Sequence, residues 1–123
     1  MFTAYVVLAT LVASALVALA SGAFTHNARI VHELAAVGVP STMYPLLGSA
    51  ELAGALGLLA GVAVPAFAVA ACLGLIVYFC GAIVAHLRVH DGRGLAGPVV
   101  FLALAVVLLV LRMASAGTFA SVL

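Results

Sequence analysis

Long apolar runs dominate the chain, and short breaks separate them. The runs cover about residues 2–24, 44–64, 66–87 and 98–117. A membrane-spanning helix needs about 20 predominantly apolar residues, so each run is long enough to cross a bilayer once. Because lipid offers no hydrogen-bonding partner to the backbone, each span should be helical. The pattern predicts an all-α integral membrane protein: an up-down-up-down four-helix bundle in a single transmembrane domain, residues 1–123.

The first break carries the signature of a short amphipathic helix. Within residues 25–43, apolar side chains recur at the i, i+4, i+7 spacing of one helix face: Ile30, Leu34 and Val37. Thr25 or Asn27 is suited to cap the start of such a helix. We expect a helix over about residues 26–37 that lies in the membrane interface, with Arg29 and Glu33 placed to form an i,i+4 ion pair.

The other breaks carry turn signals. Pro65 predicts a tight hairpin between the second and third spans, and Pro98 is suited to the first turn of the fourth. A polar loop is expected over residues 88–97. Its turn formers are Asp91, Gly92 and Gly94.

Composition excludes a soluble domain and a nucleic-acid partner. Hydrophobic residues make up 68% of the chain and charged residues 6%, whereas a soluble domain carries about 25% charged residues. A formal net charge of +1 provides no basic surface for nucleic acid. Cys72 and Cys80 have neither redox-pair nor zinc spacing, and we interpret them as small hydrophobic residues.

The distribution of arginine predicts an orientation. Arg29, Arg88 and Arg93 follow the first and third runs, whereas Arg112 lies toward the opposite side. Connections rich in arginine stay in the cytoplasm, so both termini are expected outside. Arg112 is expected to extend its head group to the outer interface rather than to pair with Glu51.

Glu51 is the most informative residue for chemistry. If the second span begins at Tyr44, this carboxyl lies about 10 Å inside the bilayer. An acidic residue at the centre of a span costs roughly 2.5–3.5 kcal/mol, so its presence needs a reason. Two interpretations remain open: a proton-exchanging or ligand-anchoring carboxylate, or a structural hydrogen bond between helices.

Other polar side chains are expected on the same side of the membrane. Tyr78 reaches about the depth of Glu51. The rim above them should hold His26, Arg29, His86, Arg88 and His90. Such a set suits a polar head group on an apolar tail, for instance a quinone, with histidine as proton exchanger because its pKa lies near neutrality. Alternatively, these residues are ordinary interface anchors. His86 and His90 are also spaced to share a metal, but they lack a third ligand, and no metal site is predicted.

A stripe of small residues marks the second span. Its members are Ala50, Gly54, Gly57 and Gly61. Small residues let helix backbones approach closely in lipid, and we interpret the stripe as a helix-packing seam.

Three segments together resemble the DoxX-like family of small four-helix bacterial membrane proteins. They are residues 37–40, 51–61 and 86–88, and the resemblance extends over about residues 2–112. It implies a protein of the bacterial cytoplasmic membrane. Some relatives are the membrane subunit of a thiosulfate:quinone oxidoreductase, and others accompany oxidoreductase or oxidative-stress complexes. Glu51 matches the acidic position of the family's second span, whereas Thr25 stands where the family commonly carries lysine.

These observations lead to two hypotheses. The first is a DoxX-like membrane subunit in a quinone-linked redox or oxidative-stress process, with a polar pocket around Glu51 near the cytoplasmic face; any enzymatic role would be that of an accessory oxidoreductase subunit. The second is a non-catalytic anchoring or assembly subunit of a larger membrane complex. Expected partners are the lipid bilayer and other membrane or membrane-associated proteins, and a homo-oligomer stays open.

Overall fold

The computed structural model describes residues 2–90, 92 and 94–116. The helices of this part of the chain are α1 (Phe2–Phe24), α2 (Ala28–Ala36), the 3-10 turn η1 (Ser41–Met43), α3 (Tyr44–Ala60), α4 (Pro65–Arg88) and α5 (Ala96–Ala116). Within the described ranges, four helices are long and apolar enough to cross a membrane: α1, α3 with η1, α4 and α5. The predicted all-α fold, with four spans and a short helix between the first two, is confirmed.

Helix boundaries follow the turn signals with small shifts. Helix α3 ends at Ala60, and residues 61–64 form the hairpin, in which the amides of Val62 and Ala63 bond to carbonyls three residues earlier. Pro65 is the first residue of α4, where its missing N–H leaves no hydrogen bond unmade. Asp91, Arg93 and the expected end of the last span at residue 117 lie outside the described residues.

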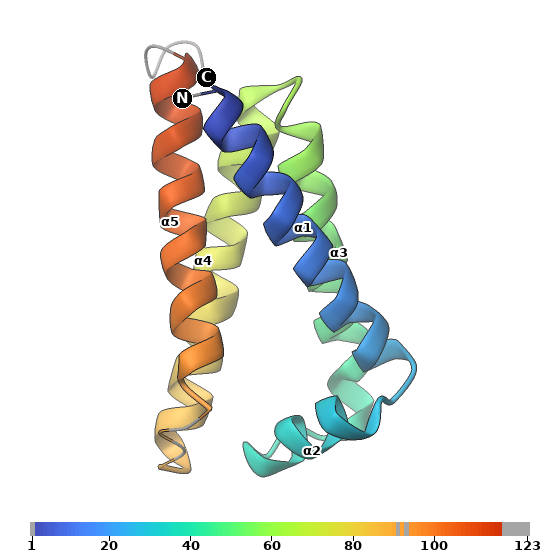
Figure 1. The fold of residues 1–123 in the computed structure, drawn as a ribbon. Coiled ribbons are helices and arrows are strands. Elements are labelled where there is room, and N and C mark those ends of the chain that lie inside the picture. Colours follow the sequence, from blue (N-terminus) through green and yellow to red (C-terminus); the bar gives the residue numbers. More distant parts are fainter. Residues whose placement is uncertain (1, 91, 93, 117–123) are drawn as a thin grey trace.

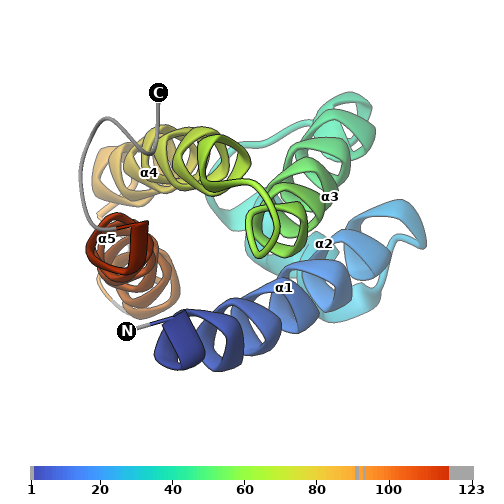
Figure 2. The same cartoon turned by 90° about the horizontal axis from the view of Figure 1, so that it is seen from above.

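The four long helices form two pairs that meet at one end and separate at the other. Helix α1 packs mainly on α3, and α4 packs mainly on α5 (Figure 2). The pairs converge where α1 begins and α5 ends, and they spread toward the opposite end, which α2 crosses (Figure 1). We call these the narrow end and the wide end of the bundle.

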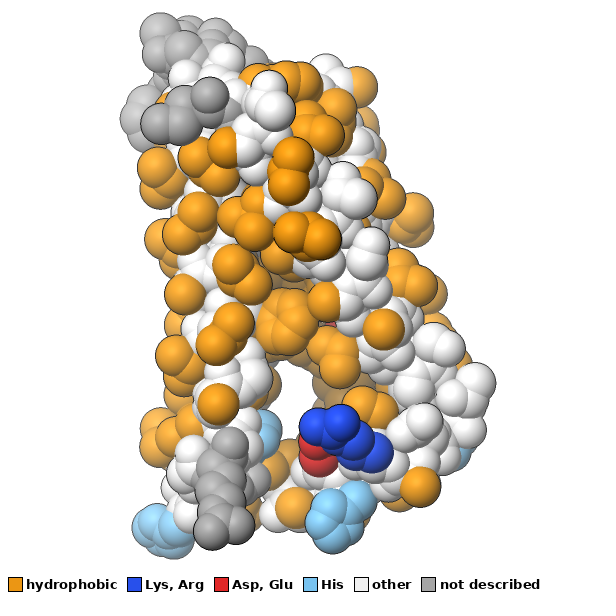
Figure 3. All heavy atoms as spheres, in the orientation of Figure 1, with side chains coloured by type: hydrophobic (Ala, Val, Ile, Leu, Met, Phe, Trp, Pro, Cys, Tyr) orange, Lys and Arg blue, Asp and Glu red, His pale blue; other side chains and the backbone are white. Residues whose placement is uncertain are grey.

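Small and aliphatic side chains fill the narrow part of the bundle. The core includes Tyr5, Ala9, Leu16, Leu58, Ala68, Cys72, Leu75 and Leu108. The outer surface is also apolar over most of its height (Figure 3), with Leu11, Leu56 and Val77 each more than 60% exposed. Because lipid tails are as apolar as leucine, burial alone does not hold such helices together, and close packing must contribute instead.

Glycines of α3 allow α4 to approach closely. A Cβ atom added to Gly54, Gly57 or Gly61 would clash with a side chain or the backbone of α4. The facing residues are Leu75, Ala71 and Ala68, respectively. Ala50, from the same predicted stripe, is exposed and lines a surface groove between α3 and α4. The close contact therefore involves the three glycines, whereas Ala50 lies beside it.

Arg112 joins three helices at the narrow end. Its side chain is 6% exposed. Its Nε donates to the carbonyl of Gly61 at 2.8 Å, and its Nη2 donates to that of Val62 at 3.4 Å. The guanidinium carbon lies 5.1 Å and 5.7 Å from the ring centroids of Phe2 and Tyr5. Carbonyls at the end of a helix lack partners within it, and Arg112 supplies donors for them.

These contacts agree with the expectation that Arg112 does not pair with Glu51, and its expected approach to the outer interface stays a prediction. Its head group is buried against the turn after α3. The physical reason is that α3 stops at Ala60, which leaves unpaired carbonyl oxygens beside α5. A guanidinium has five donors in a fixed fork, and these oxygens accept from two of its nitrogens.

The close approach at the end of α3 predicts the effect of one added methyl group. Gly61→Ala should destabilise the bundle by roughly 1–3 kcal/mol. The new Cβ would lie 2.6 Å from the Cα of Ala68, a backbone atom that cannot turn aside. Gly74→Ala is the matched control, since a Cβ there meets nothing within 4 Å. The measurement is the free energy of unfolding in mixed micelles titrated with dodecyl sulfate, and equal stabilities of the two variants would contradict the close approach.

The Arg112 contacts predict a second stability effect. Arg112→Met should lower the free energy of unfolding by roughly 1–3 kcal/mol, because it leaves the Gly61 and Val62 carbonyls without donors. Arg112→Lys keeps the positive charge but lacks the planar guanidinium with its fixed set of N–H donors. Its free energy of unfolding should therefore lie between those of wild type and Arg112→Met. The same titration measures both variants. A methionine variant as stable as wild type would show that these hydrogen bonds do not hold the narrow end.

Candidate functional site

A cavity of about 870 Å³ lies between the two helix pairs at the wide end. All five helices and the connection after α4 contribute to its lining. The surface is hollowed at this place, with basic and acidic side chains at the edge of the hollow (Figure 3). The cavity exists because the pairs separate below the close contacts of the narrow end.

Glu51 and Tyr78 meet at the inner part of this cavity. Glu51 extends from α3 and is 6% exposed. Tyr78, on α4, lines the same part of the cavity as Glu51. A recess of about 90 Å³ adjoins both side chains, and apolar residues such as Leu19, Leu34 and Leu47 form most of its wall. The acid and the phenol therefore form a small polar centre in apolar surroundings.

Aromatic rings form one wall of the cavity. Phe79 of α4 and Phe101 of α5 stack with centroids 5.0 Å apart and an interplanar angle of 12°. Tyr78 meets Phe79 edge-on at 4.9 Å. All three residues line the cavity, so a planar group that reached Glu51 would lie near an aromatic wall.

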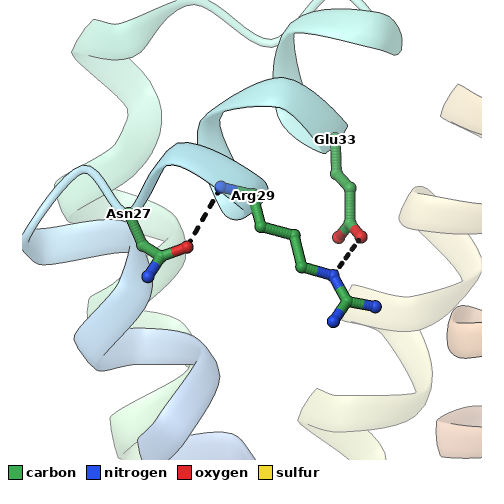
Figure 4. Close-up of polar contacts among 3 residues, drawn as sticks. All are labelled: Asn27, Arg29 and Glu33. Carbon is green, nitrogen blue, oxygen red and sulfur yellow. Dashed lines mark hydrogen bonds and ion pairs between the residues drawn. The ribbon is translucent and has the colours of Figure 1, made fainter.

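Helix α2 provides one side of the cavity mouth. Asn27 caps this helix by accepting from the backbone N–H of Arg29 at 3.1 Å, and Arg29 Nε lies 3.4 Å from Glu33 Oε1 (Figure 4). The predicted cap and ion pair are thus both confirmed. The two charged side chains are 86% and 56% exposed, and an exposed pair contributes at most about 1 kcal/mol. The pair therefore contributes polarity at the mouth more than stability.

Histidines from the end of α4 provide the other side of the mouth. His86 is half-buried, and its Nδ1 lies 2.8 Å from the carbonyl oxygen of Ala82. His90 adopts a left-handed backbone conformation, with φ of 56°, in the connection that leads toward α5. Both histidines line the cavity, opposite the polar side chains of α2.

The structure brings together some of the proposed site residues and separates others. Glu51, Tyr78, His86 and Arg29 line one cavity. His26 does not line it; its ring packs 5.3 Å from the ring of Tyr44. Arg88 is exposed and is also not part of the lining. The cavity centre thus consists of the acid and the phenol, with two of the proposed histidines, His86 and His90, and one arginine at its mouth.

Three lining residues with polar or aromatic side chains were not predicted from the sequence. His32, Phe79 and Phe101 all contribute to the cavity. A signal for His32 was available, because Arg29, His32, Glu33 and Ala36 follow the i, i+3, i+4, i+7 spacing of one helix face, and all four line the cavity. The two phenylalanines lie in uniformly apolar helices, where periodicity does not separate a cavity wall from a lipid-facing side.

The candidate chemistry is that of hydrogen bonding and proton exchange. Over the ranges that the structure describes, histidine, cysteine, aspartate and glutamate nowhere gather in groups of three that would suit a metal ion. A carboxyl and a phenol donate to or accept from a carbonyl or hydroxyl group. The centre is therefore suited to a small polar group carried on an apolar molecule.

Comparison with known proteins identifies the family. The model of the DoxX-like family matches residues 7–119. Comparisons with curated proteins and with solved structures give no match. The family match extends over most of the chain and includes every residue of the cavity. The chain is thus an integral membrane protein that belongs to the DoxX-like family.

Proposed function

We propose that the wide-end cavity binds the ring of a membrane quinone, and that the protein is the membrane subunit of a quinone-linked redox process. The observation that carries this proposal is that Glu51 and Tyr78 line the same recess at the inner part of an aromatic-walled cavity. An acidic residue inside a span is costly. A ligand that hydrogen-bonds to the acid would account for its presence.

The chemistry of both quinone states fits this centre. A quinone carbonyl accepts a hydrogen bond, which the Tyr78 hydroxyl or a protonated Glu51 donates. A quinol hydroxyl donates one, which a carboxylate accepts. Reduction of a quinone to its quinol takes up two electrons and two protons. The proposed path for the protons runs between the cavity mouth, where His86 lies, and Glu51.

The electrons have to come from a partner protein with a redox centre. This makes the chain an accessory subunit of an oxidoreductase. The resemblance to DoxX-like proteins that serve as subunits of quinone-reducing enzymes supports the assignment. A purely anchoring subunit would have no use for a buried acid and phenol beside a cavity.

We propose that the wide end faces the cytoplasm of a bacterial inner membrane. Arg29 and Arg88 are exposed at the wide end, whereas Arg112 is buried at the narrow end. The positive-inside rule then places both termini outside. In this orientation the cavity mouth meets the cytoplasm, from which protons for quinone reduction would be drawn.

Removing either polar group of the centre should weaken quinone binding. Glu51→Gln and Tyr78→Phe are each expected to raise the Kd roughly 3- to 10-fold, the worth of one hydrogen bond. The probe is a benzoquinone with a decyl tail, measured by equilibrium dialysis between micelles with and without protein. Tyr44→Phe is the matched control, since this buried tyrosine packs on His26 away from the cavity.

Two results would overturn the quinone assignment. One is wild-type protein that takes up no more quinone than empty micelles. The other is a Kd for the decyl benzoquinone that is the same in Glu51→Gln, in Tyr78→Phe, in wild type and in the control Tyr44→Phe. If mild detergent then recovers stoichiometric protein partners, the anchoring role becomes the better account.

The orientation has a separate test by cysteine labelling. In a variant with Cys72 and Cys80 replaced by alanine, single cysteines are placed at Ala63 and at Thr25, which are exposed at opposite ends of the bundle. A membrane-impermeant maleimide added to intact spheroplasts should label Ala63→Cys. It should label Thr25→Cys only after permeabilisation. The reverse pattern would place the cavity mouth outside.

A further inference from the structure

A second cavity, of about 530 Å³, lies on the side of α1 that faces α5. Much of its wall belongs to the last three turns of α1, including Ala15, Ala18 and Gly22. Their small side chains leave the space between α1 and α5 unfilled. The two helices separate toward the wide end (Figure 1), so this cavity is open to the side of the bundle.

The two cavities adjoin each other. Four residues line both: Leu19 of α1, Arg29 and Glu33 of α2, and Phe101 of α5. Leu19 also lines the recess beside Glu51. The two cavities thus meet at Leu19 and Phe101, which lie along the route from the outer side of α1 to the acid and the phenol.

The charged groups along this route lie on its wide-end side. Arg29 and Glu33 extend from α2 toward α4 and α5 (Figure 4). Ser21, Thr25 and Asn27 add polar groups at the end of α1, whereas the wall farther from that end is formed by Ala15, Ala18 and Leu19, together with Phe101 of α5. A molecule in this gap would have a hydrocarbon part against apolar side chains and a polar part turned inward.

We propose that the gap between α1 and α5 is a lateral portal, through which an amphipathic ligand with one polar ring and a flexible hydrocarbon tail enters from the bilayer. This inference rests on the proposed quinone site and adds the route and the place of the tail. The ring passes Leu19 and Phe101 to reach Glu51 and Tyr78, while the tail stays between α1 and α5. The alternative route is from water, between α2 and the histidines His86 and His90.

The portal has a kinetic signature. Lipid tails and the portal walls are similarly apolar, so moving the tail from bilayer to portal adds little binding energy. Blocking the portal should then change the rate of ligand exchange much more than the affinity. If the ligand comes from lipid, a block at the cavity mouth between α2 and the two histidines would not slow ligand exchange in this way.

The experiment uses a fluorescent reporter and a reversible plug. The chain has no tryptophan, so Phe101→Trp provides a single signal that a bound quinone quenches, and Phe79→Trp provides an independent second reporter. Each reporter is combined with Ala18→Cys after replacement of Cys72 and Cys80 by alanine. A benzyl disulfide formed at position 18 narrows the portal, and reductant removes it.

Matched controls separate the portal from the lipid-facing surface. Val17→Cys carries the same plug on the same helix, at a residue that is 46% exposed and lines neither cavity. Phe67→Trp, on the outer side of α4 and 54% exposed, reports quenching by quinone that is merely dissolved in lipid. The probe is the decyl benzoquinone in phosphatidylcholine vesicles, followed by stopped-flow mixing.

The expected result is that the plug at position 18 slows quenching and its reversal at least tenfold, with less than a threefold change in Kd. Reductant should restore the rate, and the plug at position 17 should have no effect. Unchanged exchange with the plug at position 18, while Glu51→Gln still weakens binding, would overturn the portal and leave the quinone site in place. Quenching at Phe101→Trp and Phe79→Trp no greater than at Phe67→Trp would overturn both.

Discussion

The close contact at the narrow end is the constraint on which the rest of this structure depends. There the backbone of Gly61 lies against Ala68, and Arg112 donates to the carbonyls of the turn that follows α3. The Tyr5 hydroxyl adds a hydrogen bond of 2.8 Å to the carbonyl of Leu58. In a membrane, packing and hydrogen bonds of this kind hold helices together, because burial of apolar surface contributes little.

Such a fastening at one end explains the opening at the other. The glycines that face α4 occupy the part of α3 from Gly54 to its end, and Arg112 lies near the end of α5. Toward the wide end the helix pairs separate, and α2 extends from the α1–α3 side toward the space between them (Figure 1). The cavity is therefore a consequence of where close packing stops, and it places Glu51 beside open space rather than beside another helix.

Among the residues that the structure describes, two charged side chains are buried, and their surroundings differ. Arg112 has backbone carbonyls and Ser115 as partners and lines neither of the two large cavities described above. Glu51 lines, together with Tyr78, a recess that adjoins the large cavity. A fully partnered charge supports the fold, whereas an acid with space beside it suits a ligand or an exchanging proton. This contrast favours a functional interpretation of Glu51 over a purely structural one.

The sequence alone was enough to predict that lipid surrounds most of the chain, where the helices lie, and which residues close in sequence contact each other. Lengths of apolar runs reveal spans, and the spacing near Asn27 and Arg29 reveals a capped amphipathic helix, because these are properties of consecutive residues. Only the tertiary structure decided which distant side chains meet. It placed Tyr78 beside Glu51, moved His26 and Arg88 away from the cavity, and turned Arg112 inward onto α3. One reason is that a span in lipid is apolar on every face, so the periodicity of its sequence does not tell which face meets a neighbouring helix. The other is that the separation of the helix pairs depends on contacts between residues about 50 positions apart in the sequence.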